Sequence, residues 1–154
     1  MVVGLSALSP AAALANDELK TTQFDKPFRM KAEGKLVKVE GPGYASPCWA
    51  DIDGDGKKDL LVGQFRNGRI TVYKGLGAGK IAKGNLLKVG EEAIKVPGVW
   101  WCTSSTPQFV DVNGDGFGDI LSGCYSSKKK GMAGFFYVMY GAKDKSFTKP
   151  EVLK

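Results

Sequence analysis

Acidic and amide side chains stand at relative positions 1, 3, 5 and 9 in two short stretches of this 154-residue chain. Oxygen ligands at alternate positions, with glycines that permit a sharp turn, are typical of a calcium loop. The sequence therefore predicts two Ca²⁺ sites. The expected ligands are Asp51, Asp53, Asp55, Asp59 and the backbone carbonyl of Lys57 in the first loop, and Asp111, Asn113, Asp115, Asp119 and the backbone carbonyl of Phe117 in the second.

The spacing distinguishes these loops from an EF-hand. An EF-hand places a bidentate glutamate at position 12, where this chain has Val62 in one loop and Ser122 in the other. A turn rich in Asp and Gly that binds no metal is the remaining alternative. Because the four carboxylates of the first loop would repel one another without a cation, a bound divalent ion is favoured.

Each loop lies within a longer repeat. Pro47 to Gly63 reads PCWADIDGDGKKDLLVG, and Pro107 to Gly123 reads PQFVDVNGDGFGDILSG. The proline, the acidic or amide positions, the loop glycines, the apolar run and the closing glycine coincide in the two copies. This agreement predicts two copies of one supersecondary unit.

Short runs rich in apolar, aromatic and β-branched residues follow each loop, and no stretch predicts a long helix. These features indicate an all-β fold. The strands are expected at 47–52, 60–64, 69–74 and 80–89 in the first unit, and at 109–112, 120–124, 135–140 and 147–153 in the second.

The loop sequences DIDGDGKKDLLVG and DVNGDGFGDILSG resemble the FG-GAP or VCBS repeats of calcium-binding β-propellers, including the head of integrin α chains. The resemblance covers about residues 24–154. It implies that each unit is a four-stranded antiparallel blade whose metal loop joins the first two strands. The expected fold is therefore an incomplete β-propeller of two blades plus an N-terminal strand or hairpin. Asn113 departs from the acidic pattern and lowers the charge of the second site.

The N-terminal fifteen residues carry no charge and end in Ala13-Leu14-Ala15, which is typical of a secretory signal peptide. No basic residue precedes Lys20, so a disordered Ala-rich tail is the alternative. Export would place the protein outside the cell, at the cell surface or in the periplasm. The expected divisions are 1–15 signal peptide, 16–26 leader, 27–45 outer strand or strands of a preceding blade, 46–89 first blade, 90–105 interblade loop and linker, and 106–154 second blade.

Two blades cannot close a propeller, since closed propellers have about four to eight. We therefore expect further blades as partners, supplied by a longer chain or by self-association. The net charge of +6 does not indicate nucleic-acid binding, because no basic helix or RNA-binding aromatic signature accompanies it. No membrane span is expected. The run from Lys128 to Lys130 is read as a solvated loop tip.

Three cysteines permit at most one internal disulfide. Cys102 with Cys124 is the favoured pair and Cys48 is another candidate partner, while the alternative is that all three are small buried apolar residues. Five aromatic residues could form a binding platform or pack in the core and between blades: Tyr44, Trp49, Trp100, Trp101 and Tyr125.

No catalytic residues are expected, since the chain has no histidine, no GxSxG and no P-loop. The sequence predicts a secreted calcium-binding β-propeller module that acts as a binding or scaffold domain, with Ca²⁺ in a structural role and a carbohydrate or protein ligand. Two alternatives stay open. One is part of a larger calcium-dependent enzyme acting on polysaccharides, and the other is an oligomeric lectin built from few-blade protomers.

Overall fold

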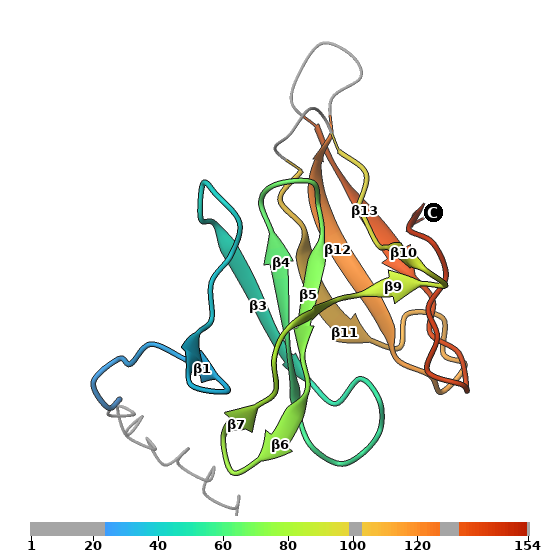
Figure 1. Cartoon of the computed structure of the whole chain (residues 1–154). Coiled ribbons are helices and arrows are strands. Elements are labelled where there is room, and N and C mark those ends of the chain that lie inside the picture. Colours follow the sequence, from blue (N-terminus) through green and yellow to red (C-terminus); the bar gives the residue numbers. More distant parts are fainter. Residues whose placement is uncertain (1–23, 99–102, 127–132, 154) are drawn as a thin grey trace, which may run out of the picture.

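The computed structural model describes residues 24–98, 103–126 and 133–153 (Figure 1). Regular structure in these residues consists of short strands in antiparallel sheets, and the expected all-β fold is confirmed. Within the same ranges, no helix is long and apolar enough to span a membrane. The signal-peptide stretch 1–15, Trp100, Trp101, Cys102 and the run from Lys128 to Lys130 lie outside the described residues.

Two four-stranded sheets have the same strand order and each carries one of the predicted metal loops. Sheet 1 consists of β3 (Ala45–Ala50), β4 (Asp59–Gln64), β5 (Ile70–Tyr73) and β8 (Asn85–Leu86). Sheet 2 consists of β11 (Thr106–Val110), β12 (Asp119–Ser126), β13 (Ala133–Met139) and β14 (Glu151–Val152).

The first strand of each sheet lies earlier in the chain than the sequence predicts. β3 ends at Ala50 and β11 ends at Val110, one residue before the first aspartate of each loop. The reason is local: Asp51 and Asp111 accept backbone N–H groups from the residues that follow, which turns the chain away from the strand direction.

Three two-stranded hairpins accompany the sheets: β1 (Lys31–Ala32) with β2 (Lys35–Leu36), β6 (Gly75–Gly77) with β7 (Lys80–Ile81), and β9 (Lys88–Val89) with β10 (Glu92–Ala93). The single outer strand expected at 80–89 is therefore wrong, because this stretch is divided among β7, β8 and β9. Ala78 and Gly79, both with positive φ, turn the chain between β6 and β7.

Hairpins β1–β2 and β9–β10 have the same closing hydrogen bond. The N–H of Val37 donates to the Met30 carbonyl (3.0 Å), and the N–H of Ile94 donates to the Leu87 carbonyl (2.8 Å). Val37 packs against the face of sheet 1 that contains Leu60, Val62 and Tyr73. Ile94 lies in the core cluster with Ile120 and Met139 of sheet 2 and with Leu61 and Ile70 of sheet 1. Each sheet is thus preceded by a hairpin, and the second hairpin contacts both sheets.

The main core lies between the two sheets, which stand side by side in Figure 1. Sheet 1 contributes Leu61 and Ile70 to it, and sheet 2 contributes Ile120 and Met139. Gly63 on β4 allows the sheets to touch: a Cβ there would lie 2.1 Å from the Ser105 carbonyl oxygen and 2.6 Å from Pro107 Cδ. Any side chain at this position would push the sheets apart.

Cys48 and Cys124 are half-buried against this core, and both are free thiols. The structure therefore contains no bridge between Cys48 and Cys124, and Cys102, the favoured partner of Cys124, lies outside the described residues. Burial raises the pKa of the Cys124 thiol, and a hydrogen bond from the Phe135 backbone opposes this effect in part.

Candidate metal centre

The two loops occupy equivalent places, one joining β3 to β4 and the other joining β11 to β12. Each turns at two glycines with positive φ, Gly54 (71°) and Gly56 (82°) in the first loop, Gly114 (75°) and Gly116 (87°) in the second. Residues with a Cβ rarely adopt these values, so the glycines fix where the chain reverses.

The first aspartate of each loop holds the turn together. In the first loop, the N–H groups of Gly54 (2.7 Å) and Asp55 (3.1 Å) donate to Asp51 Oδ1, and the N–H of Gly56 (2.9 Å) donates to Oδ2. In the second loop, Gly114 (2.7 Å) and Gly116 (2.9 Å) donate to the two oxygens of Asp111. The two bonds from the loop glycines thus form in both copies.

The last aspartate of each loop is buried and ties the loop to the third strand. Asp59 is 1% exposed, and its two oxygens accept the N–H groups of Ile52 (3.1 Å) and Gly75 (2.7 Å). In the second copy Asp119 accepts from Val112 and Gly141, both at 2.8 Å.

Glycine is required at the partner of this buried aspartate. A Cβ on Gly75 would lie 2.1 Å from the Lys58 carbonyl oxygen, and one on Gly141 would lie 2.1 Å from the Gly118 carbonyl oxygen. The sequence held a signal for this role, because Gly75 and Gly141 align when the two units are compared.

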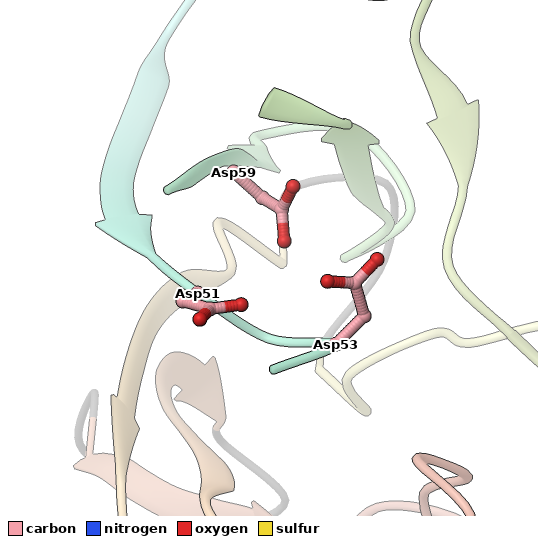
Figure 2. A group of neighbouring side chains, drawn as sticks. All are labelled: Asp51, Asp53 and Asp59. Atoms are coloured by element: carbon pink, nitrogen blue, oxygen red, sulfur yellow. The ribbon is translucent and has the colours of Figure 1, made fainter. Parts of the chain in front are cut away.

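Asp51, Asp53 and Asp59 point toward a common space (Figure 2), and one oxygen from each lies within 4.8 Å of the other two. Two oxygens on opposite sides of one Ca²⁺, each about 2.3–2.6 Å from the ion, are about 5 Å apart. The donor set and its spacing therefore fit a hard divalent cation of this size. Three of the expected first-loop ligands are brought together in this way.

Asp55 is not in this converging group. Its Oδ1 accepts the N–H of Lys57 (2.9 Å), and its Oδ2 lies 3.3 Å from the ammonium of Lys74, which also contacts Asp53 Oδ2. The Lys57 N–H and then Lys74 hold the pKa of Asp55 below its usual range. Hydrogen bonds to Asp53 and Asp55 raise the pKa of Lys74. The loop pattern did not predict a role for Lys74, because Lys74 follows β5 and lies 21 residues from Asp53 in the sequence.

The second loop has a different side-chain arrangement on the same backbone. Asn113, the counterpart of Asp53, donates from Nδ2 to Asp115 Oδ2 (2.9 Å), and the N–H of Phe117 donates to Asp115 Oδ1 (2.8 Å). Among the described residues, three converging acidic side chains occur in the first loop alone. The second loop therefore offers a weaker donor set.

The two loops lie at the same end of the paired sheets. A cavity of about 130 Å³ between them is lined by Asp51 and Gly54 from the first loop and by Gly116 and Phe117 from the second. Lys145, which precedes β14, also lines this cavity, and its Nζ would be 3.0 Å from a Cβ on Gly54.

Comparison with known families identifies one match. Residues 51–122 match the family model described as the FG-GAP-like repeat. The matched stretch begins at the first aspartate of the first loop and ends in β12, so it includes both loops. The comparisons found no matching curated protein and no matching solved structure. The chain is thus an all-β protein that contains an FG-GAP-like repeat, which suggests a β-propeller type of binding or scaffold module.

Proposed function

We propose that this chain is a secreted calcium-binding β-propeller module that serves as a binding or scaffold domain and catalyses no reaction. The observation that carries the proposal is the convergence of Asp51, Asp53 and Asp59 in a loop that connects the first two strands of a sheet. The FG-GAP-like match over both loops supports it, since such repeats resemble calcium-binding blades.

Calcium in the first loop would supply positive charge among carboxylates that otherwise repel one another. Asp51 and Asp53 lie in the turn itself, whereas Asp59 begins β4 and accepts the N–H of Gly75. An ion held by all three would therefore fix the turn relative to β4 and to the end of β5. Its role is structural, because it would set how the sheet presents its loops.

The second loop would form the other calcium site with Asp111, Asn113, Asp115 and Asp119. Its three carboxylates and one amide give it a lower negative charge than the four carboxylates of the first loop. Extracellular calcium modules bind with Kd values of roughly 10⁻⁴ to 10⁻³ M. At about 1 mM free calcium, each such site would stabilise the fold by about 0.4–1.4 kcal/mol.

The far face of sheet 2 supports the proposal that further blades are the partners. Phe136 pairs with Gly123 on β12 as Ile70 pairs with Gly63 on β4, so the two residues hold equivalent positions. Ile70 is 0% exposed between the sheets, whereas Phe136 is 62% exposed.

The glycine beside Phe136 points to the same conclusion. Ser105 and Pro107 pack closely against Gly63, where a Cβ would clash with them. A Cβ on Gly123 would meet, among the described residues, Thr106 Oγ1 at 3.0 Å and the Phe136 ring at 3.9 Å. We infer that this face receives another blade, either from a longer chain or from a second copy.

A groove gives a specific place for the proposed carbohydrate or protein ligand. Its volume is about 640 Å³, within the range of ligand-binding clefts. Arg69, Lys95 and Lys149 line it together with Glu92, which pairs with Lys149 (3.6 Å), and with the apolar side chains of Leu86 and Val89. Because cationic side chains outnumber acidic ones in this lining, we propose a ligand that carries negative charge, such as an acidic glycan.

Calcium binding is the direct test of the proposed function. Calorimetric titration of the full chain should show uptake in the 10⁻⁴ to 10⁻³ M range. Asp53→Ala should abolish the stronger site, because it removes one of the three converging oxygens. Glu91→Ala is the matched control, since Glu91 is an exposed carboxylate outside both loops that pairs with Lys88. A folded chain that takes up no calcium would refute the proposal.

A further inference from the structure

The Lys74 side chain contacts the first loop, although Lys74 itself lies just after β5 and not in the loop. It follows β5 directly and precedes Gly75, whose N–H donates to Asp59. Its ammonium contacts Asp53 Oδ2 and lies 3.3 Å from Asp55 Oδ2. Asp53 is also a member of the converging group, so Lys74 and a cation in the loop would share a carboxylate.

We propose that Lys74 is a built-in competitor of the metal ion at the first loop, an inference that rests on the proposed function. A divalent ion bound to Asp51, Asp53 and Asp59 would be repelled by the ammonium and would compete with it for Asp53. Calcium uptake is therefore coupled to the release of Lys74 from the loop.

The exposure of Lys74 makes this exchange feasible. Its side chain is 52% exposed, so the ammonium can move into water without leaving a buried position. Lysine is a strongly hydrated point charge on a flexible stem, and exposed ion pairs of this kind are weak. Lys74 therefore lowers the affinity of the first loop without blocking it.

The second loop provides an internal comparison. Tyr140 precedes Gly141, whose N–H donates to Asp119, so it holds the position that Lys74 holds in the first unit. The first loop has four carboxylates, and two ammonium groups pair with them: Lys74 pairs with Asp53 and Asp55, and Lys57 pairs with Asp55 (3.8 Å) outside the converging group. The net charge of this set is −2, whereas the three carboxylates and one amide of the second loop give −3. Lys74 thus offsets the higher affinity that the acidic residues alone predict for the first site.

The test measures calcium affinity by calorimetry in full-length chains that each retain one intact loop. Asp115→Ala leaves the first loop intact, and Asp53→Ala, which removes one of the three converging oxygens of the first loop, leaves the second. Adding Lys74→Met to the Asp115→Ala chain should lower the Kd for calcium by roughly three- to tenfold, because exposed ion pairs are weak but two are lost together. Adding it to the Asp53→Ala chain should leave the Kd unchanged. Lys74→Gln should reproduce the effect of the methionine variant.

Lys145→Met is the matched control for a general effect of charge. Lys145 also approaches the first loop, at Gly54, yet no ion pair joins it to the loop carboxylates in the described structure. It should change the Kd by less than twofold. Equal effects of the two lysine variants, or no effect of Lys74→Met, would overturn the competition while leaving calcium binding intact. An absence of calcium binding with and without Lys74 would instead overturn the proposed function as well.

Amine labelling gives a second readout that does not depend on affinity. Saturating calcium should raise the rate at which acetic anhydride acetylates Lys74, measured by mass spectrometry, because the ammonium is released into water. Lys149, which is 76% exposed and pairs with Glu92, is the reference and should be unaffected. A labelling rate at Lys74 that does not respond to calcium binding would contradict the exchange.

Discussion

Replacing Asp59 by asparagine should destabilise the chain even when no calcium is present. Asp59 is 1% exposed, and its two oxygens accept the N–H groups of Ile52 and Gly75 at 3.1 and 2.7 Å. Asparagine retains one acceptor oxygen and places an NH₂ group where the other oxygen was. One hydrogen bond is lost, and one buried N–H faces another donor.

The magnitude follows from these two bonds. A hydrogen bond to a charged group contributes about 1.5–3 kcal/mol, and an unsatisfied buried donor costs about 1–3 kcal/mol. We expect Asp59→Asn to lower the free energy of unfolding by about 2–3 kcal/mol, since the two terms describe the same lost bond. For a chain of this size the melting temperature should fall by about 4–12 °C.

Thermal unfolding in EDTA, followed by circular dichroism, measures this effect without a contribution from bound calcium. Asp55→Asn is the matched control, because it makes the same chemical change in the same loop at an exposed carboxylate that lies outside the converging group. It should leave the melting temperature nearly unchanged. Equal melting temperatures for Asp59→Asn and the unmodified chain in EDTA would show that the buried carboxylate does not stabilise the fold.

Two further predictions concern the thiol and the exposed sheet face. Because burial raises the pKa of Cys124, a smaller fraction of this thiol is ionised to thiolate at pH 8 in the folded chain. Iodoacetamide should therefore alkylate Cys124 more slowly in the folded chain than in urea. Equal alkylation rates, measured by mass spectrometry, would contradict this. Phe136 is 62% exposed on the sheet face that is proposed to contact another blade. Phe136→Ser should therefore shift the mass measured by size exclusion with light scattering toward the monomer mass of 16.5 kDa. An unmodified protein that is already a stable monomer would refute this self-association.

Features that depend on neighbouring residues in the chain were the most predictable from sequence. The loop glycines reverse the chain where the pattern placed them, and Asp51, Asp53 and Asp59 lie close together. Strand pairing about each loop also follows, because a short loop between two apolar runs brings those runs into an antiparallel pair.

Features that depend on distant parts of the chain were not predictable in this way. Lys74 lies 21 residues from Asp53, and its contact arises only when β5 pairs with β4. The loop pattern also could not separate Asp59, which is buried with two backbone donors, from Asp55, which faces Lys57 and Lys74. Both distinctions require the third strand to be in place.

The hairpin that packs ahead of each sheet determines where this protein can be divided for engineering. A boundary at Val89, the end of the first blade expected from the sequence, separates β9 from β10 and splits the second hairpin. A junction between Leu86 and Leu87 keeps the β9–β10 hairpin intact ahead of sheet 2, as β1–β2 precedes sheet 1. The N–H groups of Leu87 and Val96 would then form the link to the preceding sheet, through the carbonyls of Ile70 and Gly68. A module exchanged or inserted at that junction would bring its own hairpin, with the core contact that Val37 makes in the first unit and Ile94 makes in the second. Designed arrays of this repeat should therefore be divided after β8.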